Sequence, residues 1–395
     1  MSGGVDSSVT AKLLADQDFD LSAVFMRNWD TRDESGTDKG CEWEKDWEDV
    51  QRVCKVLGLP CEMIDLSRQY WNRVFEPSLK QWELGVTPNP DVWCNKEIKF
   101  GALLEHLPAT ARSETWFATG HYARKAWTIS DPHHADPFLR PKLLQAFDKN
   151  KDQSYYLSSI SEAGLHRALF PLGNLTKPEV REIASKYHLP TAERAESMGL
   201  CFVGEKSKFG DFISGYIPPK PGPIVDLMTN KTVGKHGGLW TYTIGEKARI
   251  GGMSQKMFVA KKDTITNTIY IVPGTNHEAL YTPALRIRDF SWVWADSPPP
   301  EIYSRSGFRA YIKYRHRMDN IMCTVYRQVF RIRIQTPVTH SGSITSSPIN
   351  PRGVEIWFDE PQKSIALGQV AALWNLEGEW CLGCGVITKI SPAAR

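Results

Sequence analysis

The chain opens on a pair of glycines that stand between hydroxyl residues and run directly into a helix-like segment. Ser2-Gly-Gly-Val-Asp-Ser7 is followed by Ser8-Val-Thr-Ala-Lys-Leu-Leu14. Adjacent glycines let backbone N–H groups close around phosphate oxygens, hydroxyls add donors, and a helix N-terminus adds partial positive charge. The simpler alternative is a glycine-rich turn that only caps a helix. We interpret the segment as a nucleotide phosphate loop in which Asp6 orients magnesium or a reacting group.

The loop lacks the lysine of GxxxxGK[ST], which argues against a Walker-type NTPase. It resembles the SGGxDS loop of the N-type ATP pyrophosphatases, which cleave ATP to AMP and pyrophosphate while adenylating a carbonyl oxygen. In such folds the loop follows the first, central strand of the sheet, yet only Met1 precedes it here. A missing inner strand exposes unpaired backbone groups. We therefore expect that the first strand is absent and that the start is truncated or mis-assigned, any targeting sequence being lost with it.

The pattern along the chain predicts three parts, because 395 residues exceed one ordinary core. Alternating strand-like and helix-like segments over residues 1–204 favour an α/β domain with a parallel sheet, and the resemblance of its loop implies one of the adenine-nucleotide hydrolase-like (PP-loop) kind. Within it, the apolar spacing of Val50, Val53, Cys54 and Leu57 predicts one helix, and the capping-box spacing of Thr176 and Glu179 predicts the start of another. Frequent Gly and Pro over residues 205–275 indicate a small central domain. Short alternating strands over residues 276–395 predict a C-terminal β-barrel, with a polar insertion near residues 336–351.

Composition excludes some classes of protein. No apolar run approaches the ~18 residues of a membrane span, so we expect no membrane partner. The eight cysteines lack the spacing of a secreted disulfide framework. Cys381 and Cys384 form the only close pair, and a lone CxxC favours ordinary strand residues over zinc, so we expect no metal site of protein ligands. From Tyr281 onward, 14 Lys and Arg residues stand against 9 Asp and Glu residues, so the tail is basic.

Two cysteines lie in surroundings that favour chemistry. Cys94 follows a Pro-punctuated loop, precedes helix-compatible residues and stands near Lys96, which together lower the pKa of a thiol. Cys201 lies in a short apolar segment between glycines and by itself would read as a small buried hydrophobe. Beside an adenylating loop, a pair of thiols suits sulfur transfer, in which one carries a persulfide and the other attacks it.

At this point the resemblance becomes close and covers nearly the whole chain: the sequence resembles the tRNA-specific 2-thiouridylase family of bacteria and mitochondria. The matching segments are Ser2 to Ser7, Phe25 to Trp29, Thr87 to Phe100, Ala118 to Tyr122, Asn150 to Tyr155, Gly199 to Gly204 and Leu367 to Gln369.

The resemblance implies roles for individual residues. Cys94 takes the position of the nucleophile and Cys201 that of the persulfide carrier, with Asp6 as a further catalytic residue. ATP would contact Ser2, Gly3, Gly4, Val5, Asp6, Ser7, Met26 and Gly120. The tRNA would contact Asn89, Pro90, Asp91, His121, Lys151, Asp152, Gln153, Lys313, Tyr314 and Gln369. Without the family pattern, His121 reads as a structural histidine and Lys151 to Gln153 as a solvated turn.

The tail fits an RNA partner. If Arg309 to Arg317 is a strand, its period of two places Arg309, Tyr311, Lys313, Arg315 and Arg317 on one face. Basic residues with an interleaved aromatic ring suit an RNA backbone and unstacked bases. A solvated charged strand face is the alternative.

We therefore expect an enzyme that uses ATP and Mg²⁺ to adenylate O2 of the wobble uridine in tRNAs of the Lys, Glu and Gln type. Sulfur from the Cys201 persulfide, supplied by a persulfide donor protein, would then displace AMP. Cys94 would resolve the persulfide, for which the two Cα atoms must come within about 4.4 to 6.8 Å. The alternatives are an amidating ligase with the same ATP loop and a non-catalytic tRNA-binding relative. Details such as Arg249-Ile-Gly-Gly252 resemble the mitochondrial branch of the family more than the bacterial one, which implies the mitochondrial matrix, with a bacterial cytoplasm as the alternative.

Overall fold

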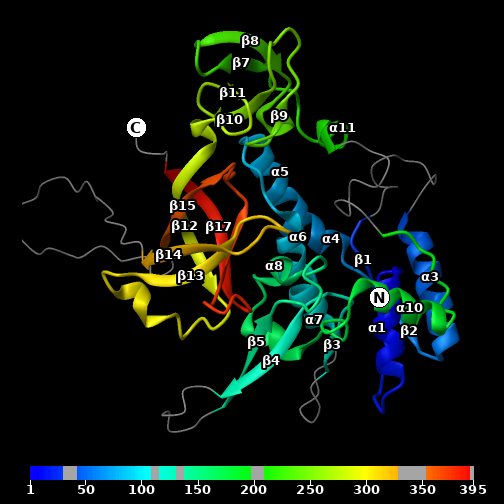
Figure 1. Cartoon of the computed structure of the whole chain (residues 1–395). Coiled ribbons are helices and arrows are strands. Elements are labelled where there is room, and N and C mark those ends of the chain that lie inside the picture. The colour runs from blue at the N-terminus through cyan, green and yellow to red at the C-terminus, as the bar shows by residue number, and fades with distance from the viewer. Residues whose placement is uncertain (30–41, 108–114, 130–137, 197–208, 328–352, 392–395) are drawn as a thin grey trace, which may run out of the picture.

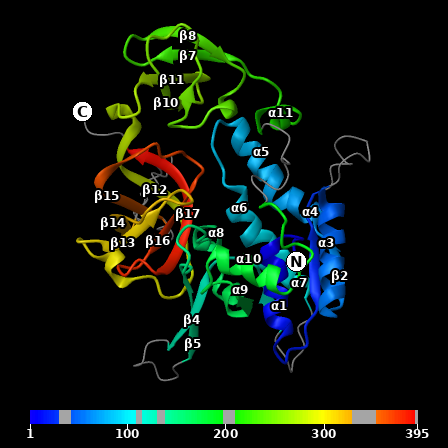
Figure 2. The same cartoon turned by 45° about the vertical axis from the view of Figure 1, so that its right-hand side comes forward.

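The computed structural model of the chain describes residues 1–29, 42–107, 115–129, 138–196, 209–327 and 353–391. Figures 1 and 2 show three parts: an α/β part that holds the N-terminus, a small sheet above it, and a barrel at its side. These correspond to the three kinds of pattern read from the sequence.

The α/β part contains two short parallel strand pairs rather than one continuous sheet. β1 (Ala23–Arg27) pairs with β2 (Cys61–Asp65), and β3 (Phe117–Ala118) pairs with β6 (Ala168–Leu169). Within the described ranges no strand joins the two pairs. The amino group of Met1 instead donates to the carbonyl oxygen of Val24, so the backbone just before the phosphate loop hydrogen-bonds to β1.

Helices cover these strands. α1 (Val5–Ala15) packs against α10, and α3 (Glu42–Leu57) follows the apolar spacing that predicted it. α10 (Lys177–Lys186) begins with the expected capping box of Thr176 and Glu179. The other helices are α4 (Ser67–Tyr70), η1 (Trp71–Phe75), α5 (Glu76–Glu83), α6 (Pro90–Trp93), η2 (Cys94–Ala102), α7 (Leu103–His106), α8 (Ser154–Leu157), α9 (Glu162–Arg167) and α11 (Phe209–Ser214).

Two of these segments, η1 and η2, are π-helices that lie inside longer continuous helices. The second runs without interruption from Pro90 through η2 to His106. A π-helix forms i→i+5 hydrogen bonds and therefore changes which side chains share a face. The N–H of Leu103 donates to the carbonyl of Ile98 in this way. The change falls on the segment that carries Cys94.

The small sheet consists of five strands in the order β8-β7-β11-β10-β9. Their bounds are β7 (Gly222–Asp226), β8 (Lys231–His236), β9 (Lys247–Ala248), β10 (Met257–Asp263) and β11 (Thr268–Pro273). Aliphatic side chains such as Ile224, Val259 and Ile271 form its own core. The short helix η3 (Leu239–Thr241) packs against this sheet through Leu239, whose side chain also approaches Gly85.

The C-terminal part is a closed antiparallel barrel, as predicted. The strands β12-β15-β14-β13-β16-β17 follow one another, and a further pairing of β12 with β17 closes the ring. Their bounds are β12 (Tyr281–Trp292), β13 (Phe308–Lys313), β14 (Ile321–Arg327), β15 (Val354–Lys363), β16 (Val370–Trp374) and β17 (Trp380–Ser391). Two short helices, η4 (Glu278–Leu280) and η5 (Pro300–Tyr303), flank β12. The insertion near residues 336–351 lies outside the described residues.

Two connections join the parts. The hairpin of β4 (Arg124–Ile129) and β5 (Leu139–Leu144) continues the barrel sheet, because β5 pairs with β17. The loop after α5 touches both other parts: Lys262 donates to the carbonyl of Gly85 at 2.8 Å, and the N–H of Thr87 donates to the carbonyl of Leu367 at 2.9 Å. The segment that leads to Cys94 is thereby held by all three parts.

Candidate functional site

The glycine loop has the geometry of a phosphate cradle. Gly3 has φ +73°, which a residue with a side chain rarely adopts, and Gly4 is the N-cap of α1. No side chain caps this helix end, so the first-turn N–H groups point into the loop unblocked. The hydroxyl of Ser7 donates to the carbonyl of Gly4 at 3.0 Å and accepts from the N–H of Ser2 at 3.1 Å. The loop is thus closed and preorganised for an anion.

Gly120 lies against this loop. A methyl group built on it would stand 2.9 Å from the carbonyl carbon of Asp6 and 2.9 Å from the nitrogen of Ser7. Both are backbone atoms, which cannot rotate away as a flexible side chain could. Only glycine allows this approach, so Gly120 lies directly beside the loop, and its contact with ATP stays a prediction. Met26, also expected to contact nucleotide, lies on β1 and packs at the edge of an apolar cluster.

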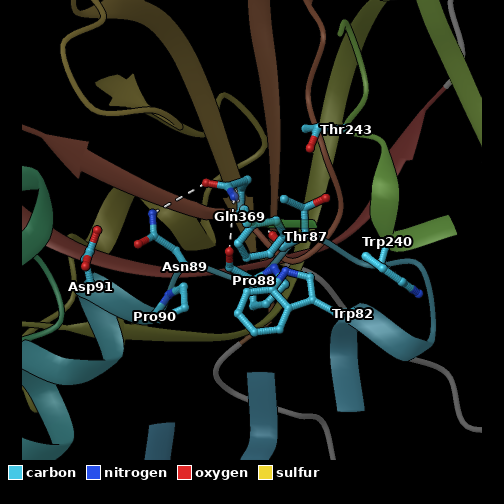
Figure 3. A pocket seen from close by; sticks show the side chains of 10 residues that line it. Trp82, Thr87, Pro88, Asn89, Pro90, Asp91, Trp240, Thr243 and Gln369 are labelled. Atoms are coloured by element: carbon cyan, nitrogen blue, oxygen red, sulfur yellow. Dashed lines mark hydrogen bonds between the residues drawn. The ribbon is translucent and has the colours of Figure 1, made fainter. Parts of the chain in front are cut away.

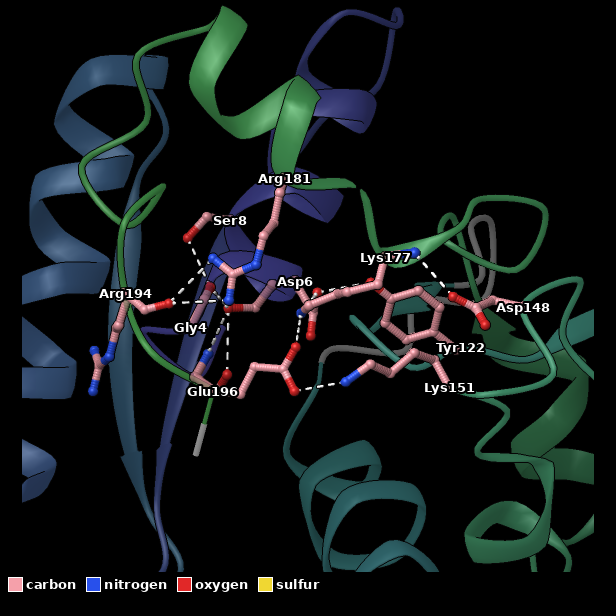
Figure 4. A network of polar contacts seen from close by, with 12 residues as sticks. Gly4, Asp6, Ser8, Tyr122, Asp148, Lys151, Lys177, Arg181, Arg194 and Glu196 are labelled. Carbon is pink, nitrogen blue, oxygen red and sulfur yellow. Dashed lines mark hydrogen bonds and ion pairs between the residues drawn. The ribbon is translucent and has the colours of Figure 1, made fainter. Parts of the chain in front are cut away.

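Asp6 belongs to a network of charges that begins at the loop (Figure 4). Its carboxylate accepts from the Lys177 ammonium at 2.6 Å and from the Tyr122 hydroxyl at 2.9 Å. Lys177 also lies 3.6 Å from Glu196, which in turn pairs with Lys151 at 2.6 Å. The Lys177 side chain is only 9% exposed. The phosphate loop itself contains no lysine, and the buried Lys177 from a distant part of the chain faces it instead.

Arg194 holds the loop from the opposite direction. Its guanidinium donates to the carbonyl of Gly3 at 2.9 Å and pairs with Asp46 and Asp49. The Gly3 carbonyl is thereby held by Arg194, and no side chain caps the N-terminus of α1. Neither Arg194 nor Lys177 was found from the sequence. The capping box at Thr176 was visible there, but nothing local showed that the following lysine reaches Asp6.

The arrangement fits a nucleotide triphosphate. The loop supplies N–H donors, the α1 terminus and Lys177 supply positive charge, and Asp6 supplies a carboxylate of the kind that Mg²⁺ prefers. Across the described ranges, no group of three or more His, Cys, Asp or Glu side chains could hold a metal by itself. A magnesium ion here would be shared with the phosphates, in the way that this hard cation is commonly held.

Cys94 is the first residue of η2 and is 5% exposed. The helix begins earlier, at Pro90 with Asn89 as N-cap, so Cys94 lies in its second turn with its own N–H bonded. The dipole effect on a thiol falls off within the first turn. Lys96, expected beside the thiol, is half exposed and pairs with Glu97 at 3.3 Å. Cys201 lies outside the described residues, so its distance from Cys94 stays untested.

A cavity of about 240 Å³ opens beside Cys94's helix (Figure 3). Its lining comes from all three parts of the fold: Trp82, Thr87, Pro88, Asn89, Pro90, Asp91, Phe209, Trp240, Thr243 and Gln369. Asn89 donates to the Gln369 side chain at 3.5 Å, and Gln369 donates to the carbonyl of Thr87 at 3.1 Å. Four of the residues expected to contact tRNA, namely Asn89, Pro90, Asp91 and Gln369, thus line one cavity.

The other expected tRNA contacts differ in their surroundings. Asp152 is buried and accepts from the N–H of Ala146 at 2.9 Å, while Lys313 lies 3.7 Å from it. Gln153 accepts from the N–H of Tyr122 at 3.0 Å. The ring of Tyr314 is 2% exposed and lies in the barrel core. In this state these side chains hold the fold together, and their contact with RNA stays a prediction.

The basic strand face is shorter than expected. β13 ends at Lys313, and Arg309 and Lys313 do lie on its outer face as the period of two predicted. Arg309 forms a double hydrogen bond with Asp359 at 2.6 and 2.7 Å, which neutralises part of the face. Cys381 and Cys384 are buried in β17, consistent with ordinary strand residues. Among the described helices, none has the length and apolarity needed to cross a membrane.

His121 is half-buried, follows Gly120 in the chain and contacts Lys99 on η2. Burial, and then the charge of Lys99, hold its pKa well below the ordinary value. Its ring is therefore neutral, with Nε2 at 3.5 Å from the Lys99 ammonium and Nδ1 at 2.8 Å from the Thr119 hydroxyl. Burial also raises the pKa of the Asp91 carboxyl, which the charge of Lys99 opposes.

The comparisons with known proteins agree with this geometry. Family models match in three consecutive segments: a tRNA methyl transferase HUP domain over residues 1–205, a tRNA methyl transferase PRC-barrel domain over residues 210–273, and an aminomethyltransferase beta-barrel domain over residues 326–387.

Relatives align over nearly the full chain. The tRNA-specific 2-thiouridylase MnmA of Ralstonia pickettii is 40% identical over 399 residues, covering 100% of this chain and 96% of the relative. The tRNA-specific 2-thiouridylase MnmA 2 of Geobacillus kaustophilus is 38% identical over 392 residues, covering 99% and 94%. The mitochondrial tRNA-specific 2-thiouridylase 1 of Homo sapiens is 34% identical over 411 residues, covering 100% and 90%.

Proposed function

The chain belongs to the tRNA-specific 2-thiouridylase family, and on that premise we propose that it adenylates the wobble uridine of tRNA and then replaces the activated oxygen with sulfur. The observation that carries the proposal is the continuity of the site. The phosphate loop, whose Asp6 pairs with Lys177, lies against Gly120. The next residue in the chain, His121, contacts Lys99 on the helix that also carries Cys94. The first residues of that helix, Pro90 and Asp91, line the cavity.

The loop end of the site would bind the phosphates. N–H groups of α1 and the Lys177 ammonium face the same space as the Asp6 carboxylate, which suits a magnesium-bound triphosphate. Bound ATP supplies the adenylyl group that turns the uracil oxygen into a leaving group. Asp6 would be the side chain that holds magnesium, and Lys177 would then pair with phosphate oxygens, because a lysine is a compact point charge on a flexible stem.

The cavity end would bind the uridine. Asn89, Asp91 and Gln369 present amide and carboxylate groups, while Trp82 and Phe209 present apolar rings. This combination suits a base that has left the anticodon stack, because such a base needs both hydrogen bonds on its edge and an apolar contact on its face. The target would be U34 in tRNAs of the Lys, Glu and Gln type.

Sulfur would then pass through two thiols. Cys201 would carry a persulfide received from a donor protein, and Cys94 would attack its inner sulfur. The Cys94 thiol is oxidised to a disulfide with Cys201, the terminal sulfur leaves as sulfide, and sulfide displaces AMP at C2 of the uracil. A thiol reductant would then restore both cysteines. The resemblance supports these roles, and Cys94 belongs to the same continuous helix as Pro90 and Asp91, which line the cavity.

The test is mass spectrometry of nucleosides from unmodified tRNA incubated with the purified chain, ATP, Mg²⁺ and a persulfide donor. We expect 2-thiouridine at position 34 together with release of pyrophosphate that depends on tRNA. Cys94→Ser and Cys201→Ser should still release pyrophosphate but form no 2-thiouridine, whereas Cys61→Ser on β2 should behave as the parent does.

Two outcomes would contradict the proposal. A folded parent that binds tRNA without releasing pyrophosphate would be a non-catalytic relative. Product formation that persists in Cys94→Ser, with ammonia instead of sulfide as the nucleophile, would favour the amidating ligase.

For the compartment we propose the mitochondrial matrix, with a bacterial cytoplasm as the alternative, since both groups of relatives cover the whole chain. Fractionation of the source cells decides between them.

A further inference from the structure

Lys99 lies at the junction between the two ends of the site, although no role for it emerged from the motifs. It is half buried on η2, five residues after Cys94. In an α-helix, neighbours on one face are three or four residues apart. The i→i+5 pattern of a π-helix instead brings residues five apart close to each other along the helix. On this π-helical segment the Lys99 side chain reaches His121, which follows Gly120 in the chain.

The Lys99 ammonium is held by a neutral partner. An ammonium only donates hydrogen bonds, so Nε2 of His121, at 3.5 Å, is the acceptor. The ring proton then sits on Nδ1, which donates to the Thr119 hydroxyl at 2.8 Å. This two-step contact fixes one tautomer of His121 and positions the ammonium without neutralising its charge.

No carboxylate within the described ranges forms an ion pair with Lys99, in contrast to Lys96 on the same helix, which pairs with Glu97. The charge of Lys99 nevertheless acts on groups from several elements. It opposes protonation of His121 and of the Met1 amino group, and it favours the carboxylate form of Asp91. A half-buried cation with a neutral partner, at the meeting point of loop and cavity, has the character of an anion site.

The position of this cation selects which anion it meets. Transfer of the adenylyl group proceeds in line, so the attacking uracil oxygen and the departing pyrophosphate stand on opposite sides of the α-phosphorus. In the proposed function, Lys177 and the α1 terminus are assigned to the pyrophosphate end, and Asp91, which lines the cavity, to the uracil end. Lys99 contacts His121, whose neighbour in the chain, Gly120, lies against the loop at Asp6 and Ser7, and the charge of Lys99 also acts on Asp91. The non-bridging oxygens of the α-phosphoryl group would lie between these two ends.

We propose that Lys99 is a catalytic residue of the adenylation step, whose ammonium donates a hydrogen bond to a non-bridging oxygen of the α-phosphoryl group. This rests on the proposed function. In the step, uracil O2 forms a bond to the α-phosphorus and the bond from that phosphorus to the bridging oxygen of pyrophosphate breaks. Pyrophosphate leaves with the electron pair, and the N3 proton of uracil passes to solvent. Lys99 stabilises the negative charge that grows on the equatorial oxygens during the transfer.

The experiment compares Lys99→Met with Lys96→Met, which removes a lysine from the same helix. Single-turnover pyrophosphate release is measured with saturating tRNA, and calorimetry measures binding of AMP and of inorganic pyrophosphate separately. Loss of one preorganised donor commonly costs about 10²- to 10³-fold in rate, which is the loss we expect for Lys99→Met. AMP affinity should fall about 10-fold and pyrophosphate affinity should stay within about 2-fold, because a charged hydrogen bond to the α-phosphate is lost.

The outcomes separate this inference from the proposed function. A parent protein without tRNA-dependent pyrophosphate release would refute the function itself. An active parent whose Lys99→Met variant keeps a rate within about 3-fold of Lys96→Met, or keeps its AMP affinity, would overturn the role of Lys99 alone. Thermal melting and tRNA binding are measured on each variant. If Lys99→Met does not fold, Lys99→Gln takes its place with the same expected losses, and Lys99→Arg should recover part of the rate.

Discussion

Gly120→Ala tests the contact that joins the phosphate loop to the rest of the site. The new methyl group would stand 2.9 Å from two backbone atoms of the loop and 3.2 Å from Cβ of Asp6. Ordinary carbon contacts lie near 3.5 to 4.0 Å, so the two segments must separate by roughly 0.5 to 1 Å. The loop cannot yield elsewhere at no cost, because Arg194 holds the carbonyl of Gly3 on its other side.

Overpacking of this kind costs about 1 to 3 kcal/mol. A displacement of about 1 Å in a reacting group costs about 10²-fold in rate. We therefore expect Gly120→Ala to raise the KM for ATP about 10-fold and to slow pyrophosphate release by about 10- to 100-fold, while affinity for tRNA changes little. The melting temperature should fall only slightly, because the change is confined to one loop.

The assay is tRNA-dependent pyrophosphate release over a titration of ATP, with Gly210→Ala as the control. A methyl group at Gly210 meets no atom within 4 Å, so that variant carries the same substitution without a clash. If Gly120→Ala matched Gly210→Ala in both KM and rate within about 2-fold, the close approach of this segment to the loop would have no part in binding nucleotide.

Three further substitutions test the surrounding network. Lys177→Met should weaken binding of inorganic pyrophosphate about 10-fold, because it removes the ammonium that faces Asp6, while AMP should bind as it does to the parent. Calorimetry measures both affinities, and equal losses for the two ligands would contradict the place of Lys177 at the phosphate end. Burial and a neighbouring ammonium lower the pKa of His121, so at low pH the unfolded chain binds more protons at this residue than the folded chain does. The free energy of unfolding should therefore fall as pH drops below about 6.5. Chemical denaturation between pH 5 and 8 should show a shallower fall for His121→Asn, and an unchanged profile would show that another group titrates. Arg140 joins β5 to α9, because its guanidinium is 5% exposed and donates two hydrogen bonds to Glu162 at 2.5 and 2.6 Å. Arg140→Met should therefore lower the free energy of unfolding in urea by about 2 to 4 kcal/mol. A loss below about 0.5 kcal/mol would mean that the ion pair adds nothing to stability.

Local patterns in the sequence predicted the elements well where short-range physics decides them. The capping box at Thr176, the apolar spacing of α3 and the alternation of β13 each depend on residues within a few positions of one another. The surroundings of Cys94 were predicted less well. The helix begins four residues before Cys94, which places the thiol beyond the first turn, and Lys96 pairs with Glu97.

The fold class, the glycine loop and membership of the family were therefore determined by the sequence alone, since each rests on residues that are adjacent or on matches in order along the chain. Only the tertiary structure decided that Lys177 reaches Asp6, that Gly120 closes on the loop, and that Gln369 of the barrel joins Asn89 at the cavity. These partners are separated by 171, more than 110 and 280 residues. Chain topology brings them together, and burial then sets the charge of groups such as His121, which no local pattern of residues encodes.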